Sequence, residues 1–269
     1  ADNYLFATLY QEATRDNVIE FMTFDKRNPN SIVSCLYSAR ENARTIRECI
    51  SKEMWEKLNE LYLHVRDAAQ REHTDLNHWQ DFLNDVKMGV QLIYGIVDAT
   101  ITRNESWHFG RIGRFLERAD KTSRFLDVQY FTLLPSSESV GSTLDLMFWS
   151  AVLKSVSAYN MYRQQYRTLN PTTIVEFLIL DKRFPRSIAH CIRQAELSLY
   201  EVSGSHITNG FSNEAERTLS KLRSETEFTD MKEIFRTGLH HYLDHFQTRT
   251  NEADNAIYET YFSLKPVEV

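Results

Sequence analysis

Apolar positions recur along the chain at spacings of three, four and seven residues, which places them on one face of an α-helix. The pattern predicts helices over residues 3–12, 14–24, 30–50, 52–70, 75–102, 105–131, 142–168, 172–180, 185–203, 212–222 and 228–262. Loops are expected at Pro135–Ser142 and Glu201–Gly210. With eight glycines and five prolines, the chain has few positions suited to turns between short strands. We therefore predict an all-α fold, a multi-helix bundle.

One stretch of this helical pattern occurs twice. The segment VIEFMTFDKRNPNSIVSCLYSA covers residues 18–39, and IVEFLILDKRFPRSIAHCIRQA covers residues 174–195. Ten of the 22 positions are identical at a constant offset of 156 residues. Pro29 and Pro185 suit the first turn of a helix, where a missing N–H has no cost. Asn28 could cap the first copy. Each copy is therefore expected to be a helix–turn–helix corner.

The duplication predicts two related helical units within a single domain that covers residues 1–269. The second unit is expected to span residues 105–269, and the first about 1–104. The second unit has some 70 residues before its VEF segment, whereas the first has 17 before its IEF segment. From this difference we expect the first repeat to be incomplete at its N-terminal side.

Two predicted helices carry rows of arginines beside carboxylates. In the helix over 30–50, an apolar face contains Ile32, Cys35, Leu36, Ala39, Ala43, Ile46 and Ile50. Beside this face lie Arg40, Glu41, Arg44, Arg47 and Glu48. Spacing pairs Glu41 with Arg44 and Arg44 with Glu48.

In the helix over 105–131, the predicted core stripe is Phe109, Ile112, Leu116, Ala119, Ser123, Leu126 and Tyr130. Arg111, Arg114 and Arg118 follow one side of it, and Glu117, Asp120 and Arg124 the other. Gly110 and Gly113 each cost about 1 kcal/mol relative to alanine within a helix. Close helix packing, or an approaching ligand, would compensate, and close packing is the favoured explanation.

The arginine rows admit two interpretations. Guanidinium groups can brace helices against carboxylates, or they can converge on a phosphate or carboxylate ligand. The interleaved acidic residues favour the brace. However, Arg40, Glu41, Arg44 and Arg47 align with Glu196, Leu197, Tyr200 and Ser203 of the other copy. The shared fold therefore does not require the first row, which supports a binding role, and both interpretations stay open.

Composition and the absence of known catalytic motifs limit the classes of function that the sequence supports. The net charge of −6 and the lack of a Lys/Arg block argue against nucleic-acid binding. Three cysteines without a C-x-x-C pair predict a reduced, cytoplasmic protein with buried thiols. The apolar stretch MGVQLIYGIV has about half the roughly 20 residues of a membrane span.

The chain contains no phosphate-binding loop, no G-x-S-x-G motif and no cysteine–histidine signature. The sequence therefore predicts no catalytic residue and no cofactor. His241 and His245 have metal-ligand spacing, but surface histidines without a metal are favoured.

The segments GRFLERADKTSRFLDV and NPNSIVSCLYSARENAR resemble the bacterial alpha-E domain, a helical family named for a Glu-Arg motif. The resemblance covers nearly the whole chain and assigns the motif to Glu117 and Arg118, with Arg40, Glu41 and Arg44 in the ARENAR block. It implies a genomic context with a circularly permuted ATP-grasp ligase and a transglutaminase-like peptidase. Family members usually begin with an additional helix similar to 113–126, in keeping with the incomplete first repeat.

Two functions are expected. The first is a non-catalytic helical partner or scaffold in a peptide synthesis or modification system, bound to an ATP-grasp-type ligase or a transglutaminase-like protein. The alternative is a helical enzyme acting on an anionic or peptide substrate. There, Glu117 or Glu41 would be the acid/base, and Arg40, Arg44, Arg111 and Arg118 would hold the substrate. The full candidate binding set is Arg40, Glu41, Arg44, Arg47, Glu48, Arg111, Arg114, Glu117, Arg118 and Asp120.

Overall fold

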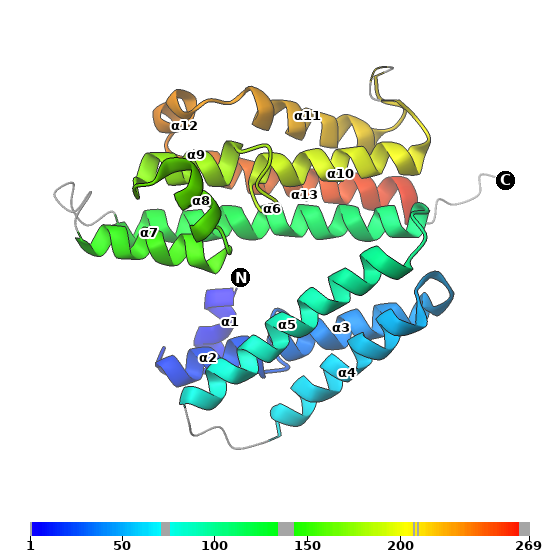
Figure 1. The fold of residues 1–269 in the computed structure, drawn as a ribbon, viewed down its shortest axis with the longest axis vertical. Helices are drawn as coiled ribbons and strands as arrows, with labels where there is room; N and C mark the ends of the chain where they lie inside the picture. Colours follow the sequence, from blue (N-terminus) through cyan, green and yellow to red (C-terminus); the bar gives the residue numbers. More distant parts are fainter. Residues whose placement is uncertain (1, 71–75, 134–142, 207, 209, 264–269) are drawn as a thin grey trace. The chain divides into compact units, whose positions relative to one another are not determined.

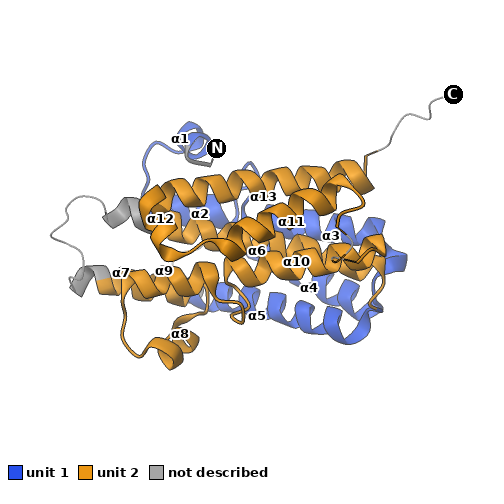
Figure 2. Cartoon of the chain, turned by 90° about the horizontal axis from the view of Figure 1, so that it is seen from above, with its two compact units in different colours: residues 1–102 blue, residues 103–269 orange. Residues whose placement is uncertain are grey.

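The computed structural model describes residues 2–70, 76–133, 143–206, 208 and 210–263, and every regular element in these ranges is helical (Figure 1). The all-α prediction is confirmed. The predicted loop Pro135–Ser142 lies outside the described residues. The chain divides into two units, residues 1–102 and 103–269, which are coloured separately in Figure 2.

Unit 1 contains α1 (Asp2–Leu9), α2 (Arg15–Thr23), α3 (Ile32–Thr45), the 3-10 turn η1 (Arg47–Cys49), α4 (Lys52–Ala68) and α5 (Leu76–Thr100). α4 packs against both α3 and α5. Their apolar faces and Phe24, which directly follows α2, form a core of Phe24, Val33, Leu36, Ala43, Leu58, Leu61, Val65, Ala68, Phe82 and Ile93. A Cβ added at Gly89 of α5 would lie 2.7 Å from a terminal methyl group of Leu61, so a larger residue there would require the Leu61 side chain to shift.

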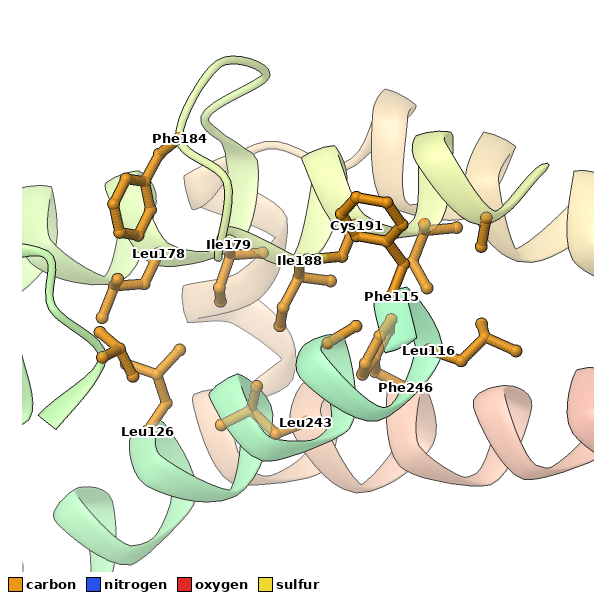
Figure 3. Close-up of a cluster of buried hydrophobic side chains, with 14 of the residues drawn as sticks. Phe115, Leu116, Leu126, Leu178, Ile179, Phe184, Ile188, Cys191, Leu243 and Phe246 are labelled. Atoms are coloured by element: carbon orange, nitrogen blue, oxygen red, sulfur yellow. The ribbon is translucent and has the colours of Figure 1, made fainter. Parts of the chain in front are cut away.

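Unit 2 contains α6 (Glu105–Leu133), α7 (Thr143–Ser155), α8 (Tyr159–Tyr166), α9 (Pro171–Leu180), α10 (Ile188–Ser203), α11 (Glu214–Phe228), α12 (Met231–Thr237) and α13 (Leu239–Tyr261). α6 and α11 each pack against both α10 and α13, which gives a four-helix bundle. Figure 3 shows its centre, where Leu126 of α6, Leu178 of α9 and Leu243 of α13 belong to one buried cluster.

Capping residues and positive φ angles set helix boundaries that periodicity alone misplaced. Pro29 and Pro185 precede their helices instead of lying in the first turn, because the Ser31 and Ser187 side chains cap α3 and α10. The predicted helix 142–168 is two helices, with Ser157 (φ 54°) between them. The predicted helix 228–262 is likewise divided at Gly238, whose φ of 90° interrupts the helix.

The two similar segments form similar corners, one in each unit. The Asp25 carboxylate accepts the backbone N–H of Arg27 at 2.9 Å, and the Asp181 carboxylate accepts that of Arg183 at 2.7 Å. α2 and α9 begin 156 residues apart, and so do α3 and α10. The same offset relates two aromatic triplets with similar edge and stacked geometries: Phe6, Tyr10 and Phe21 in unit 1, and Tyr162, Tyr166 and Phe177 in unit 2.

The corner of unit 1 contains a carboxylate whose ionisation is coupled to folding. Arg27 donates to Asp25 through Nε at 2.9 Å and Nη2 at 2.6 Å, and Tyr10 donates its hydroxyl at 2.9 Å. The Arg27 guanidinium lowers the pKa of Asp25 from 3.8 to about 2. A lowered pKa stabilises the folded state above the unfolded-state pKa, and this contribution is lost as pH falls through the folded-state pKa.

We therefore expect the stability difference between the wild type and Asp25→Asn to be largest above pH 4 and to shrink between pH 4 and pH 2. Urea unfolding at a series of pH values measures this difference. Asp254→Asn removes an exposed carboxylate and controls for the change in net charge. A wild-type advantage over Asp25→Asn that is independent of pH would contradict the coupling.

Periodicity also placed in the core two residues that are exposed, one in α3 and one directly after it. Cys35 and Ile46 belong to the predicted apolar face, but both are open to solvent, and the buried positions are Val33, Leu36 and Ala43. The prediction of buried thiols holds for Cys191 and is wrong for Cys35. Cys35 and Ile46 therefore lie outside the buried core of unit 1, to which α3 contributes Val33, Leu36 and Ala43.

Candidate functional site

The first arginine row forms a compact ion cluster on α3. Glu41 lies at its centre: Arg40 Nη1 is 2.5 Å from Oε1, and Arg44 Nη2 is 2.8 Å from Oε2. The helix spacing predicted the Glu41–Arg44 pair. Because one carboxylate serves two guanidinium groups, the cluster retains a local excess of positive charge.

Arg40 also connects α3 to α4. Its Nε donates to Oδ1 of Asn59 at 2.7 Å, and its guanidinium lies 5.3 Å from the Tyr62 ring and 5.7 Å from the Trp55 ring. Arg47 approaches the same Trp55 ring at 5.7 Å. Cation–π contacts at partly buried sites contribute about 0.5–2 kcal/mol each. In this structure Arg40 is therefore a brace between two helices.

The end of the row differs from the prediction because the helix is shorter. α3 ends at Thr45, so the helical spacing expected for Arg44 and Glu48 does not extend to Glu48. Glu48 lies exposed in the turn η1, and Arg47 donates to the carbonyl of Ile50 at 3.4 Å. The structure thus brings Arg40, Glu41 and Arg44 into one cluster and places Glu48 outside it.

The second arginine row surrounds one phenylalanine ring in unit 2. Arg111, Arg114 and Arg118 of α6 lie 5.3, 5.1 and 5.5 Å from the centre of the Phe115 ring. Phe115 is buried, although the predicted core stripe omitted it. The sequence did contain a signal, since the arginines precede and follow position 115 on the same side of the helix.

This row attaches α6 to the corner and to α10. Arg111 donates to the side-chain carbonyl of Gln194, and Arg118 donates through Nη1 to the carbonyl of Pro185 at 3.2 Å. One turn further on, the Thr122 hydroxyl donates to the carbonyl of Arg186 at 2.8 Å. The arginine of the Glu-Arg pair therefore binds the backbone of the turn that precedes α10.

The thiol beside this contact is unreactive. Burial raises the pKa of Cys191 to about 12, although Arg118, Arg186 and Arg114 act in the opposite direction. The thiol is therefore protonated at neutral pH and is a poor nucleophile. It donates instead to the Pro185 carbonyl at 3.5 Å, the same oxygen that accepts Arg118.

The acidic residues Glu117 and Asp120 of α6 differ in exposure. Glu117 is 66% exposed and pairs with Lys121 at 3.0 Å. Asp120 is more buried and accepts Arg124 at 2.8 Å. The two residues of the Glu-Arg pair thus have different surroundings, since Arg118 contacts the corner and Glu117 contacts solvent. Glu117 and Glu41, the acid/base candidates of the enzyme hypothesis, are each in contact with a cation.

We expect the two members of the pair to differ in their effect on stability. Arg118→Ala should destabilise unit 2 by about 1.5–3 kcal/mol, because it removes a charged hydrogen bond to a carbonyl. Glu117→Ala should change stability by no more than about 0.5 kcal/mol, because exposed ion pairs contribute little. Urea unfolding of both variants measures the difference. Equal losses in the two variants would contradict the assignment of Arg118 to the helix–corner contact.

The two glycines of α6 lie in open space. No heavy atom of the described residues lies within 4 Å of a Cβ built at Gly110 or Gly113 beyond the neighbouring helix backbone, so the expected close packing is not found. We expect Gly110→Ala and Gly113→Ala each to raise the free energy of unfolding by up to about 1 kcal/mol. Thermal unfolding of the single and double variants measures the gain, and destabilisation would contradict the open environment.

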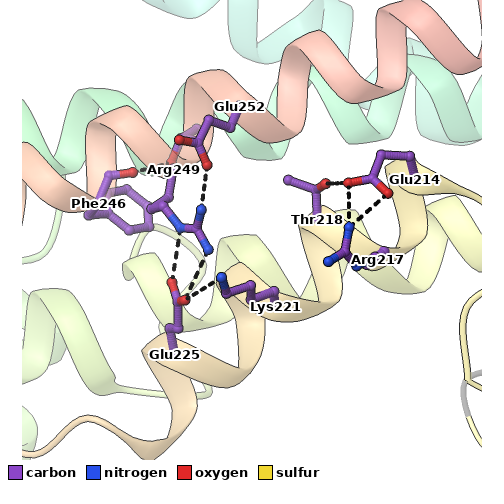
Figure 4. A network of polar contacts seen from close by, with 9 residues as sticks. Glu214, Arg217, Thr218, Lys221, Glu225, Phe246, Arg249 and Glu252 are labelled. Atoms are coloured by element: carbon purple, nitrogen blue, oxygen red, sulfur yellow. Dashed lines mark hydrogen bonds and ion pairs between the residues drawn. The ribbon is translucent and has the colours of Figure 1, made fainter.

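The sequence did not lead us to predict two further ion clusters in unit 2. Arg249 of α13 binds Glu225 of α11 at 3.1 Å and Glu252 at 2.5 Å, which joins the two helices (Figure 4). Glu196 of α10, only 1% exposed, lies 2.8 Å from Nε of Arg223 of α11. The i,i+3 spacing could have identified Arg249 and Glu252, whereas the pairs across helices have no local signal.

Three open cavities in the described part of the chain lie away from the predicted site residues. Cavities of about 440, 820 and 340 Å³ lie against α11–α13, between α4 and α5, and against α8 and the second corner, and none is lined by a residue of the candidate set. Within the described ranges, no group of three histidine, cysteine, aspartate or glutamate side chains is placed to hold a metal ion. None of the described helices is both long and apolar enough to span a bilayer.

Comparison with known proteins identifies the family. The sequence pattern of Alpha-E, described as a predicted alpha-helical domain with a conserved ER motif, matches residues 1–262. No curated protein and no solved structure matches the chain. Because the match extends over both units and includes the Glu117–Arg118 helix, the chain belongs to the Alpha-E family.

Proposed function

We propose that this Alpha-E protein is a non-catalytic helical partner or scaffold. The observation that carries the proposal is that the candidate arginines are engaged in joining secondary-structure elements. Arg40 contacts Asn59 and the rings of α4, and Arg118 contacts the Pro185 carbonyl. The nearby Cys191 thiol has a pKa raised by burial to about 12. These features favour a folded surface for binding over an acid/base or nucleophilic centre.

We propose that the chain works within the peptide synthesis or modification system that the family resemblance implies. It would comprise an ATP-grasp-type ligase and a transglutaminase-like protein in the bacterial cytoplasm. The chain's own role would be to hold the ligase or its peptide substrate. Nucleic acid is not a proposed partner, because the formal net charge is −6 and no basic block occurs.

We also propose that the two units arose by duplication at the 156-residue offset. Support comes from the positions at which matching helices start and from the matched aromatic triplets. The helices correspond in order as α1 to α8, α2 to α9, α3 to α10, α4 to α11 and α5 to α13. α6 has no counterpart in this series within the described part of unit 1.

Purification of the tagged chain with the ATP-grasp and transglutaminase-like proteins of its genomic neighbourhood tests the partner role. Stable co-purification is expected, together with ligase activity that rises when the chain is added. As a surface control, Arg44→Ala removes an exposed member of the α3 cluster without removing the Arg40 contacts to α4. Absence of association together with ligase activity unaffected by the chain would overturn the proposal.

A further inference from the structure

The corner of unit 1 contains a bound guanidinium group that the chain itself supplies. Arg27 donates to both oxygens of the Asp25 carboxylate, through Nε at 2.9 Å and Nη2 at 2.6 Å. The same guanidinium lies 5.9 Å from the centre of the Tyr10 ring. A carboxylate and an aromatic ring together recognise the planar, charged guanidinium group. This corner therefore shows how the repeated segment can hold such a cation.

The corner of unit 2 has the same three residue types in a different arrangement. Asp181, Arg183 and Tyr166 follow their counterparts in unit 1 by 156 residues. Oδ1 of Asp181 accepts the backbone N–H groups of Arg183 and Phe184, each at 2.7 Å. Among the described residues, no side chain forms a hydrogen bond or an ion pair with this carboxylate, and the Arg183 side chain is exposed. The Asp181 carboxylate thus has no guanidinium bound to it.

An open cavity of about 340 Å³ lies against this carboxylate. Phe184 occupies the position of Asn28 in the repeat, and its ring packs on that of Phe177 with the centres 4.8 Å apart. The volume is at the lower end of the roughly 300–1,000 Å³ of small-molecule sites, so the cavity suits a single side chain or a compound of similar size. The lining consists of Met161, Gln164 and Gln165 of α8 with Phe177, Asp181, Arg183, Phe184 and Pro185.

The charges around the cavity favour a cation. Burial raises the pKa of Tyr166, and the carboxylates of Glu176 and Asp181 raise it further. Two carboxylates therefore act on this end of α8, whereas Arg183 is the one cationic side chain in the cavity lining. The local excess of negative charge attracts a further positive group.

We infer that this cavity binds the guanidinium group of another molecule, of the kind that an arginine side chain presents. The N–H groups of the ligand donate to Oδ2 of Asp181, and its planar face lies against the Phe177 and Phe184 rings. The residues that form the site belong to α8, α9 and the turn that follows α9, all within unit 2. The inference goes beyond the proposed function and does not depend on it.

The side chain of Arg183 is the alternative occupant of the site. Its counterpart in unit 1 binds Asp25, but the two turns differ in their backbone hydrogen bonds. The N–H of Phe184 donates to the Asp181 side chain, whereas the N–H of Asn28 donates to the Asp25 backbone carbonyl at 3.1 Å. In unit 2 the carboxylate is therefore held by the backbone, and Arg183→Ala should bind an added guanidinium compound at least as tightly as the wild type.

The test uses isothermal titration calorimetry of the intact chain with arginine whose two ends are blocked by acetyl and amide groups. We expect binding to the wild type and a loss of about tenfold or more in Asp181→Asn, because asparagine keeps an acceptor for the backbone but lacks the charge. Asp254→Asn, at an exposed position of α13, is the matched control and should bind as the wild type does. The blocked lysine compound should bind at least about fivefold more weakly, because an ammonium group has no planar face to stack on the rings.

A second variant separates binding from folding. Gln164→Lys adds a cation at an exposed position of the lining, so it should weaken binding without changing the thermal unfolding temperature. Tighter binding of blocked arginine than of free L-arginine would assign the site to arginine within a peptide, and the reverse order to a free small molecule.

Four results would overturn the inference. The first is no binding of blocked arginine to the wild type, and the second is equal binding by the wild type, Asp181→Asn and Gln164→Lys. The third is binding by Arg183→Ala alone, which would show that Arg183 fills the cavity in the wild type. The fourth is equal binding of the arginine and lysine compounds, which would make the cavity a general cation site.

Discussion

Leu178→Ala is expected to lower the free energy of unfolding by about 3–5 kcal/mol, and Met22→Ala by no more than about 1 kcal/mol. The two residues occupy the same position of the repeated segment and of their helices. Leu178 is 0% exposed beneath α6, whereas Met22 is 44% exposed. Truncating Leu178 leaves a cavity in the buried core of unit 2, whereas truncating Met22 removes contacts at a surface.

Urea unfolding followed by far-UV circular dichroism measures both variants against the wild type. Both substitutions end in alanine on a helix, so differences in helix propensity contribute little to the comparison. Similar losses at the two positions would contradict the difference in exposure between Leu178 and Met22. A small loss for Leu178→Ala would contradict the buried environment of α9.

Arg223→Ala should destabilise unit 2 by about 3–5 kcal/mol, because it leaves the buried carboxylate of Glu196 without its cation. Glu196 Oε2 lies 2.8 Å from Arg223 Nε, and its Oε1 has no hydrogen-bond partner among the described residues. Arg223 also contacts Glu227, which in turn accepts Lys182 at 2.7 Å. The substitution thus interrupts a chain of charges that extends from the second corner into the core.

The double variant Glu196→Leu with Arg223→Met separates the cost of an orphaned charge from the net contribution of the pair. Apolar replacement of a buried pair is often neutral or stabilising, so the double variant should recover most of the stability lost by Arg223→Ala. Equilibrium unfolding of the three proteins gives the comparison. If the double variant is as unstable as Arg223→Ala, the polar pair itself holds α10 against α11.

The helices were predictable because their apolar spacing is regular and their capping residues are local. Periodicity could identify the apolar side of α3, but it could not determine whether another helix covers that side. Cys35 and Ile46 therefore looked like core residues and are exposed. Phe115 was missed for the opposite reason, since it lies beside the main stripe of α6 and becomes buried through contacts with α10.

The candidate site was predictable only at short range. The Glu41–Arg44 pair follows from i,i+3 spacing. The contact of Arg40 with Asn59 spans 19 residues, and that of Arg118 with Pro185 spans 67, so neither has a local sequence signal. These long-range contacts support the brace interpretation of the arginines, and they depend on how helices pack.

The aligned positions Arg40 and Glu196 have a consequence for the history of the chain. Each faces the next long helix, yet Arg40 meets the Tyr62 ring while Glu196 meets the Arg223 guanidinium. Changing one member alone would place a charge against an unsuitable neighbour. If the two units arose by the proposed duplication, the copies must have diverged at these positions by paired substitutions. Positions 196 and 223 should therefore vary together among related sequences. Positions 40 and 62 should vary together in the same way.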